Sequence, residues 1–306
     1  MSLNGRLKDE PAGAKLFWLL FISLGFFFVS GLLALLLSEP LFGIDMIGNP
    51  SLARDFGDPQ VIRAMKFSQT VNAIGFFIIP PILFAWLCGT DLRSFFGLGR
   101  PLKLFPIAAA VLLVIAALPL ENFVATLSDA IHFPDIIAGW ETNLRNMQEE
   151  TERTVVAFLK MEDLGDLGIN LMMVALLPAV GEEMLFRGWF QPLLIQRFRS
   201  VHMGIWITAA LFSLIHMQFF AFFPRLIMGA ALGYLFYWSR SIYLPMLAHF
   251  LNNALAILAL YFIHQGSLPE GVEDTGSDNI MLFSLSAAAV AVILFGLRRF
   301  YNEEGH

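Results

Sequence analysis

Cysteine and charged residues are scarce in this chain. Of 306 residues only Cys88 is a cysteine, and only 14% are Asp, Glu, Lys or Arg. A single cysteine excludes an intrachain disulfide and a cysteine-based metal cluster, and we interpret Cys88 as a small apolar residue buried in a helix. So little charge also excludes the usual surface of a soluble domain, because such a surface is largely polar.

Hydrophobic residues dominate instead. They make up 57% of the sequence, phenylalanine alone occurs 31 times, and the mean hydropathy is +0.69. They form apolar runs of about 17 to 29 residues, the length of helix that crosses about 30 Å of hydrocarbon. We therefore predict an all-α polytopic membrane helix bundle of about eight transmembrane helices, with spans at 16–37, 62–88, 103–119, 168–196, 202–221, 223–239, 242–263 and 280–297. The first span lacks a small-x-small cleavage site, so we expect it to be retained and not removed as a signal peptide.

Basic residues alternate along the connections between the predicted spans. Lys and Arg lie at both termini and after the second, fourth and sixth spans, whereas the other connections are mostly acidic. Because positive residues concentrate on the cytoplasmic side, this pattern predicts cytoplasmic N- and C-termini. We expect an integral protein of a bacterial cytoplasmic membrane, with the lipid bilayer and a membrane-associated protein as partners and no nucleic acid. The sequence carries no signal for the oligomeric state.

The spans and connections divide the chain into four predicted regions. These are a three-helix transmembrane region at 1–119, an extracytoplasmic amphipathic connection at 120–167, a core at 168–263, and an acidic loop with the last helix and a basic tail at 264–306. In the connection, apolar residues recur at helical spacing from Trp140 to Leu159, which predicts one or two amphipathic helices on the outer surface. We interpret them as a structural cap in preference to a lid.

The fourth span contains charged residues in its middle, in the segment "GEEMLFRG". Each charge near a bilayer centre costs about 2.5 to 3.5 kcal/mol, so such residues indicate function by default. Glu183 and Arg187 are four residues apart with the acid first, which predicts an ion pair on one helix face. Glu182 projects about 100° away from Glu183 and has no cation within its helix, so it requires a partner on another span or must hold a proton. A carboxylate placed in this way is suited to act as a general base toward water.

Two later spans carry the polar groups that could meet Glu182. His216 ends the predicted fifth span, and His249 and Asn253 share one helical face of the seventh. Alone, a buried histidine is more often a packing residue, and His-x-x-x-Asn could be a helix contact. Together with Glu182, they supply a base for water, an imidazole that orients it, and donors for a developing oxyanion. These are the parts that amide hydrolysis requires.

Other features predict architecture. Gly229 and Gly233 allow close approach of two helices. Pro178 and Gly181 bend the fourth span and free backbone groups beside the acids. The mildly polar segment "KFSQTVNAIG" of the second span suggests hydrogen bonds between helices, and Arg225 is expected to extend to the membrane interface.

The order "EEMLFR", "FSLIH" and "HFLNN" resembles the three motifs of the CPBP family, which includes the CAAX prenyl endopeptidases of the Rce1 type. The resemblance covers about residues 168 to 260. It implies an Rce1-like intramembrane protease core that cleaves a membrane-embedded or lipid-anchored protein. By this resemblance Glu182 and His216 activate the attacking water and His249 and Asn253 stabilise the oxyanion. Glu183 and Arg187 would hold the site together.

The sequence leaves the metal and the reaction open. Glu182, His216 and His249 could bind zinc as one carboxylate and two imidazoles. There is no His-Glu-x-x-His run, and we favour a glutamate-based mechanism that needs no cofactor. The alternatives are a non-proteolytic membrane scaffold or bacteriocin self-immunity protein of the same family, and a proton-coupled transporter that uses the buried Glu and His as a relay.

Overall fold

The computed structural model describes residues 3–100 and 102–303, which form helices and turns with no strand among them, as predicted. Three helices are continued by π-helical segments, η2, η4 and η5. The elements that build the bundle are α1 (Ala12–Phe42), α2 (Pro59–Ala73), η2 (Ile74–Ile78), α3 (Ile79–Cys88), α4 (Leu92–Phe95), α5 (Leu104–Asp129), α6 (Ala138–Phe158), α7 (Leu164–Asn170), η4 (Leu171–Leu176), α8 (Leu177–Leu185), η5 (Phe186–Phe190), α9 (Gln191–Phe198), α10 (Val201–Leu214), α11 (Phe222–Ser239), α12 (Tyr243–His264) and α13 (Ile280–Glu303).

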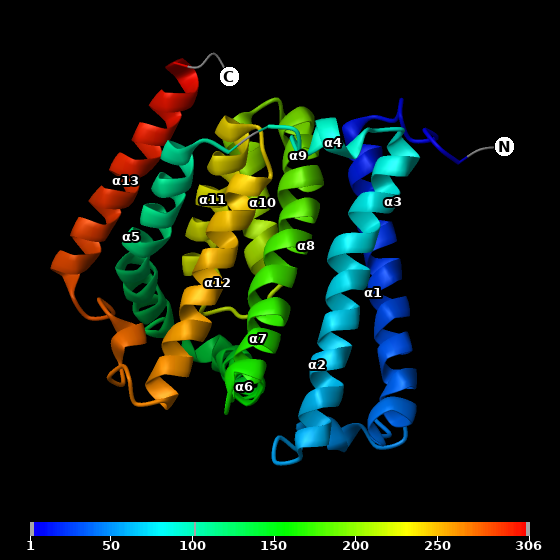
Figure 1. The fold of residues 1–306 in the computed structure, drawn as a ribbon, viewed down its shortest axis with the longest axis vertical. Helices are drawn as coiled ribbons and strands as arrows, with labels where there is room; N and C mark the ends of the chain where they lie inside the picture. The colour runs from blue at the N-terminus through cyan, green and yellow to red at the C-terminus, as the bar shows by residue number, and fades with distance from the viewer. Residues whose placement is uncertain (1–2, 101, 304–306) are drawn as a thin grey trace.

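Six of the described helices are long and apolar enough to cross a membrane: α1, α2 to α3, α5, α7 to α9, α12 and α13. The shorter apolar helix α10 and the 18-residue helix α11 lie where the fifth and sixth spans are predicted, but neither is among these six. Figure 1 shows α1 with α2 and α3 on one side, α5 with α13 on the opposite side, and the other helices between them. Both termini lie at one end, and α6 lies at the other.

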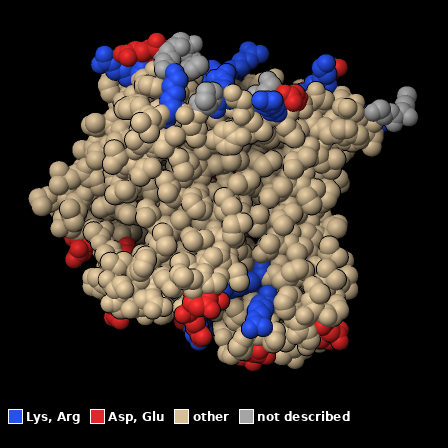
Figure 2. Space-filling view, viewed as in Figure 1, with Lys and Arg blue, Asp and Glu red and all other residues tan. Residues whose placement is uncertain are grey.

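The outer surface is that of an integral membrane protein. Large apolar side chains are exposed on the outer helices, for example Phe28 (68% exposed) on α1, Ile115 (51%) on α5 and Phe295 (66%) on α13. In Figure 2 most Lys and Arg gather at the end that carries the termini, most Asp and Glu gather at the other end, and a broad band with few charges separates them. Burial of this band in lipid removes its apolar side chains from water.

The predicted end of the third span at 119 is wrong, because α5 continues to Asp129. Pro119 lies inside the helix, where its ring disturbs the backbone hydrogen bonds of the preceding turn. Ser286 of α13 restores them: its hydroxyl accepts a hydrogen bond from the Leu120 amide (3.1 Å) and donates one to the carbonyl of Ala116. A neighbouring helix thus satisfies the groups that the proline disturbs.

The predicted end of the fifth span at 221 is also wrong. Helix α10 ends at Leu214, and the chain turns before α11 begins at Phe222. Met217, in this turn, has a left-handed φ of 54°, which an α-helix cannot contain. Ser213 supports the reversal by donating a hydrogen bond to the carbonyl of Phe222 at 2.7 Å. The turn places His216 outside regular helix.

Small residues set the distances between the central helices. An added Cβ at Gly233 would lie 2.8 Å from Cγ2 of Ile205, and one at Gly229 would lie 3.2 Å from Cβ of Ala209. Both neighbours belong to α10, so the predicted close approach is confirmed for the α10 and α11 pair. Gly181 has the same role toward η2, because its added Cβ would lie 2.8 Å from Cβ of Phe77.

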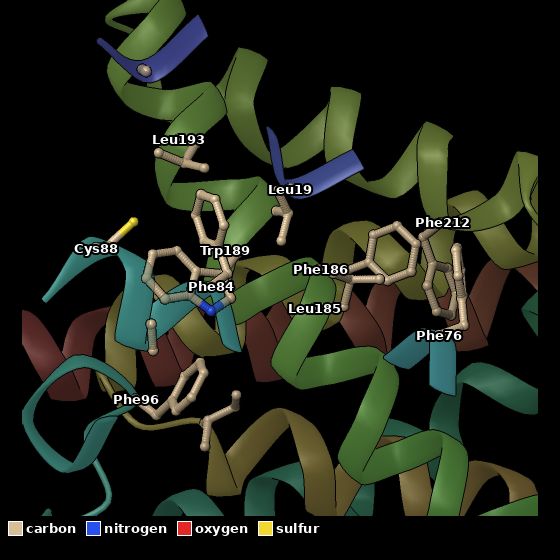
Figure 3. Close-up of a cluster of buried hydrophobic side chains, with 13 residues drawn as sticks. Leu19, Phe76, Phe84, Cys88, Phe96, Leu185, Phe186, Trp189, Leu193 and Phe212 are labelled. Carbon is tan, nitrogen blue, oxygen red and sulfur yellow. The ribbon is translucent and has the colours of Figure 1, made fainter. Parts of the chain in front are cut away.

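A cluster of buried apolar side chains joins α1, η2, α3, η5 and α10 (Figure 3). Leu185 and Phe186, from the middle of "GEEMLFRG", pack in this cluster, and Cys88 is buried in it as predicted. Trp189 donates a hydrogen bond to the carbonyl of Pro81 at 3.1 Å, which satisfies its indole nitrogen. The cluster holds the charged segment firmly against the N-terminal helices.

Hydrogen bonds between helices follow the polar face of α2, as predicted. Ser30 of α1 donates to the Asn72 side chain at 2.8 Å, and Lys66 donates to the side chain of Asn170 in α7 at 3.0 Å. These bonds tie α2 to α1 and to α7, although the amide nitrogen of Asn170 is buried without a partner among the described residues.

Candidate active site

One cavity of about 940 Å³ opens between α5, α6, η4, α8, α11 and α12 and the turn after α10. Its volume is at the upper end of the range for ligand pockets, about 300 to 1,000 Å³. Its walls include every side chain to which the sequence assigns a direct chemical role: Glu182, His216, His249 and Asn253. The fold therefore brings together groups that are up to 71 positions apart in the sequence (253 − 182).

The predicted ion pair of the fourth span is confirmed. Nη1 of Arg187 lies 2.8 Å from Oε1 of Glu183, and both side chains are 0% exposed. Nη2 of Arg187 donates to the carbonyl of Gly229 at 2.9 Å, and the guanidinium lies 4.7 Å from the ring centroid of Phe212. Neither Glu183 nor Arg187 lines the cavity. The pair lies behind the cavity wall, and each buried charge is compensated by the other.

His249 also binds Glu183, a contact that sequence reasoning missed. Its Nδ1 lies 2.8 Å from Oε1 of Glu183, the same oxygen that accepts from Arg187. Because an ionised carboxylate can only accept, Nδ1 carries the proton of this hydrogen bond. The orientation of the ring is then fixed, and Nε2 is directed toward Glu182, 3.9 Å from its Oε2. No local pattern signals this contact, since 66 positions separate the two residues.

Glu182 accepts no hydrogen bond from the described residues. Its side chain is 9% exposed, and Oε2 is buried with no hydrogen-bond partner among the described residues. The predicted partner on another span is His249, at a distance longer than a hydrogen bond. Glu182 therefore borders the cavity, and its carboxylate can accept hydrogen bonds from a molecule bound there.

His216 has one ring nitrogen committed and one free. Nδ1 lies 2.8 Å from the carbonyl of Phe212, and a carbonyl only accepts, so Nδ1 carries the proton and Nε2 is left as an acceptor. The rings of His216 and His249 both pack edge-on against Phe212, with centroids 5.2 and 5.8 Å apart. No hydrogen bond joins His216 to Glu182 in the described part of the chain, so a molecule between them is required if the two act together.

Asn253 is positioned by the proline of the neighbouring helix. Pro178 has no N–H, so the carbonyl of Val174, four residues earlier, lacks its α-helical partner. The Asn253 amide donates to that carbonyl at 3.2 Å. The prediction that Pro178 frees backbone groups beside the acids is confirmed. The amide nitrogen retains a second N–H, and Asn252 lines the cavity as well.

The described side chains do not converge as a metal site. No group of three His, Cys, Asp or Glu residues in the described ranges is arranged to hold a metal ion. Glu182, His216 and His249 therefore do not fit the zinc set that the sequence left open.

Arg225 does not extend to the membrane interface, so that prediction is wrong. It lines the cavity, its Nη2 donates to the side chain of Gln218, and its Nη1 is buried with no partner among the described residues. The reversal of the chain at 215–221 turns the start of α11 into the bundle, which the sequence pattern does not reveal. The sequence does carry one signal that Arg225 has another role. It lies in the first turn of a helix, where the helix dipole disfavours a cation.

The amphipathic connection is a single helix, α6, that forms one wall of the cavity. Met147, Thr151, Val155 and Phe158 line the cavity at helical spacing. Arg145 ties the start of α6 to the bundle through hydrogen bonds to the carbonyls of Asp129 and Ile131. The helix therefore covers the site as well as capping the bundle.

Glu141 is the second anchor of α6. Its carboxylate accepts from the Phe133 amide at 2.7 Å and from Arg145 at 2.9 Å. The Phe133 amide and then Arg145 lower the pKa of Glu141 from 4.5 to about 2. The carboxylate is therefore ionised at any pH at which the protein would work.

Comparison with known proteins points to the same segment of the chain. Residues 165–255 match the family described as type II CAAX prenyl endopeptidase Rce1-like. This segment is therefore similar to the Rce1-like family. It runs from α7 into α12 and contains all six residues to which the sequence analysis assigned a role at the site.

One curated relative of the chain is the uncharacterized protein YpbD of Bacillus subtilis (strain 168). It is 30% identical over 99 residues, which are 31% of this chain and 48% of YpbD. The chain thus spans about half the length of this relative. No solved structure matches the chain significantly.

Proposed function

We propose that this protein is an intramembrane endopeptidase of the CAAX type. It would hydrolyse a peptide bond of a membrane-embedded or lipid-anchored protein. The observation that carries the proposal is the carboxylate of Glu182, which lines a large cavity within an apolar bundle and has free acceptor capacity beside two oriented imidazoles. The Rce1-like match of the same segment supports it, because members described in this way are endopeptidases.

In the proposed reaction, water binds between Glu182 and Nε2 of His216. Glu182 takes a proton from the water as its oxygen attacks the carbonyl carbon of the peptide, and the negative charge moves to the carbonyl oxygen. Nε2 of His249, when the ring carries both protons, and the second N–H of Asn253 donate to that oxygen. Glu182 then passes the proton to the leaving nitrogen as the C–N bond breaks.

Glu183 and Arg187 act through His249. The hydrogen bond from Nδ1 of His249 to Glu183 fixes the ring, and Arg187 balances the charge of Glu183. Rigid placement of a donor is worth more in a site from which water is excluded than in solution. We also propose that both termini lie in the cytoplasm of a bacterium, which puts α6 on the extracytoplasmic side.

The test compares membrane peptides from cells that contain the wild type, Glu182→Gln or Glu270→Gln. Glu270 lies in the exposed connection before α13 and is the matched control. We expect a set of fragments that appears with the wild type and with Glu270→Gln and disappears with Glu182→Gln. Fragments that are identical in all three membranes would contradict proteolysis and favour the scaffold or self-immunity alternative.

A further inference from the structure

A second cavity lies at the end of the bundle that carries both termini, where α13 ends (Figure 1). It has a volume of about 420 Å³ and is enclosed by the start of α10, the last turns of α11 and the end of α13. This volume falls within the range of small-molecule sites, about 300 to 1,000 Å³. None of the described residues lines both this cavity and the candidate active site, so the reaction above does not use it.

The charges around this cavity have one sign. Arg240, at the end of α11, and Arg298, on α13, both line it, and no Asp or Glu is among its described lining residues. Glu303, on the same helix as Arg298, pairs instead with Arg299 at 2.7 Å. Two like charges that share a cavity repel each other, and an anion bound between them removes that repulsion.

Both guanidinium groups have donors available to a ligand. Arg240 and Arg298 are exposed, and neither side chain donates a hydrogen bond to a described residue. The Arg240 guanidinium lies over the ring of Tyr237, 5.7 Å from its centroid. Contact with a ring uses the face of the guanidinium, so the N–H groups in its plane stay available. The backbone of Arg240 is held in place, because its carbonyl fills the space beside Gly97.

His202 and Tyr234 supply a third donor. Nδ1 of His202 lies 2.6 Å from the hydroxyl oxygen of Tyr234, and both residues line the cavity. If the hydroxyl donates this hydrogen bond, the proton of the neutral imidazole lies on Nε2. If Nδ1 donates it, the hydroxyl hydrogen is left to donate elsewhere. Either arrangement leaves one further donor on this pair.

The start of α10 adds positive charge to the same wall. Val201 and His202 are the first two residues of this helix, its first turn contains no acid, and both line the cavity. Ser200 caps the helix by accepting from the Met203 amide at 3.3 Å, which leaves the two earlier amides without an acceptor in the helix. Such a helix start carries a partial positive charge and favours phosphate groups.

The surface beside the cavity is apolar and exposed. Phe295 lies one turn before Arg298 on α13, and Met203 and Trp206 lie within the first two turns of α10; all three are exposed. The rings of Tyr234 and Trp238 stack with centroids 5.2 Å apart and line the cavity. Tyr and Trp concentrate at the depth of lipid headgroups. A ligand with a phosphate in the cavity and hydrocarbon chains beside it would match both surfaces.

We propose that this cavity is a phosphate site that binds the headgroup of an anionic membrane lipid. Phosphate oxygens match the paired N–H donors of a guanidinium, and basic pockets between transmembrane helices suit lipid headgroups. Soluble phosphate offers the same oxygens but has no chains to cover the exposed apolar side chains. The bound lipid joins the ends of α10, α11 and α13. Its binding does not depend on the proposed endopeptidase function.

The first arm of the test measures lipid binding to the purified protein by native mass spectrometry. Phosphatidylglycerol, which is anionic, and phosphatidylcholine, which has no net charge, are each titrated into the micelles. We expect one phosphatidylglycerol molecule to bind more tightly than phosphatidylcholine. Arg240→Gln and Arg298→Gln should each weaken its binding about 5-fold, the usual contribution of one arginine beside lipid headgroups.

Arg299→Gln is the matched control. Arg299 follows Arg298 on the same exposed end of α13 but does not line the cavity, so its replacement should leave the affinity unchanged. An equal loss in Arg299→Gln would show a general attraction of lipid to this basic end and would overturn the site. Equal affinity of the wild type for both lipids would overturn it as well.

The second arm distinguishes a lipid from soluble phosphate. Sodium phosphate is added at the same concentration as phosphatidylglycerol, and we expect the lipid to stay bound. Displacement of the lipid would identify free phosphate as the ligand and overturn the lipid assignment.

The third arm needs no variant, so it holds even if a substitution prevents folding. Phosphatidylglycerol with a photoactivatable group in its headgroup is bound to the wild type and cross-linked, and the labelled peptides are sequenced. The label should lie in peptides that contain residues 234–240 or 298–302. Label confined to other peptides would contradict the site.

Discussion

The same substitution at the two adjacent acids of α8 should have very unequal effects on stability. Glu183→Gln removes the counter-ion of Arg187 and the acceptor of His249, and leaves a guanidinium that is 0% exposed with a carbonyl and an aromatic ring as its remaining partners. Breaking a buried ion pair by removing one partner costs about 3 to 5 kcal/mol. Glu182→Gln loses no hydrogen bond to a described residue, so we expect its free energy of unfolding to change by less than about 1 kcal/mol.

The assay is unfolding by SDS in mixed micelles, followed by circular dichroism, for the wild type and both variants. Glu183→Gln should unfold at a much lower SDS fraction than Glu182→Gln. The double variant Glu183→Leu with Arg187→Met should recover part of the loss, because replacing a whole buried ion pair with apolar side chains is often neutral. Equal destabilisation by the two single variants, or a stable Glu183→Gln protein, would refute the division of roles between these acids.

Three further outcomes test the packing and the α6 anchor. Gly233→Ala should destabilise the bundle by about 1 to 3 kcal/mol in the same unfolding assay, because the new Cβ overlaps α10, whereas Gly296→Ala, with open space around it, should be neutral or slightly stabilising. Ser286→Ala should raise amide exchange in α5 around Pro119, where its hydroxyl bridges two backbone groups; unchanged exchange would contradict that bridge. The folded pKa of Glu141, about 2, lies below the ordinary 4.5, so its contribution is present above pH 4.5 and is lost as the pH falls toward 2. Protection factors of the α6 amides should fall over this range, and Glu141→Gln should lower them at neutral pH; protection that is constant with pH would argue against the anchor.

Contacts that are local in sequence could be predicted from it. The pair of Glu183 and Arg187 follows from a separation of four residues in a helix, and the closeness of α10 and α11 follows from glycines at the same separation. Each of the eight apolar runs contains a helix, and six of these helices have the length of apolar helix that a bilayer demands. Each of these inferences depends on the geometry of one helix and not on how helices are arranged.

Contacts between distant segments could not be predicted. The hydrogen bond from His249 to Glu183 joins helices whose relative rotation the sequence does not reveal. Helix α5 continues past Pro119 because Ser286, on the last helix, repairs its backbone, and Arg225 enters the cavity because the chain reverses at residue 217. Local rules gave the wrong answer for α5 and Arg225 because a tertiary partner decided the outcome.

The most direct test of the central claim is hydrolysis by the purified protein in proteoliposomes. A peptide whose cleavage is observed in membranes is incubated in ¹⁸O water with the wild type and with Glu182→Gln. The account predicts that the wild type places ¹⁸O in the new carboxyl group and that Glu182→Gln, folded and as stable as the wild type, cleaves about 10²- to 10⁴-fold more slowly, the loss expected for a missing general base. Cleavage by folded Glu182→Gln at near the wild-type rate would contradict it.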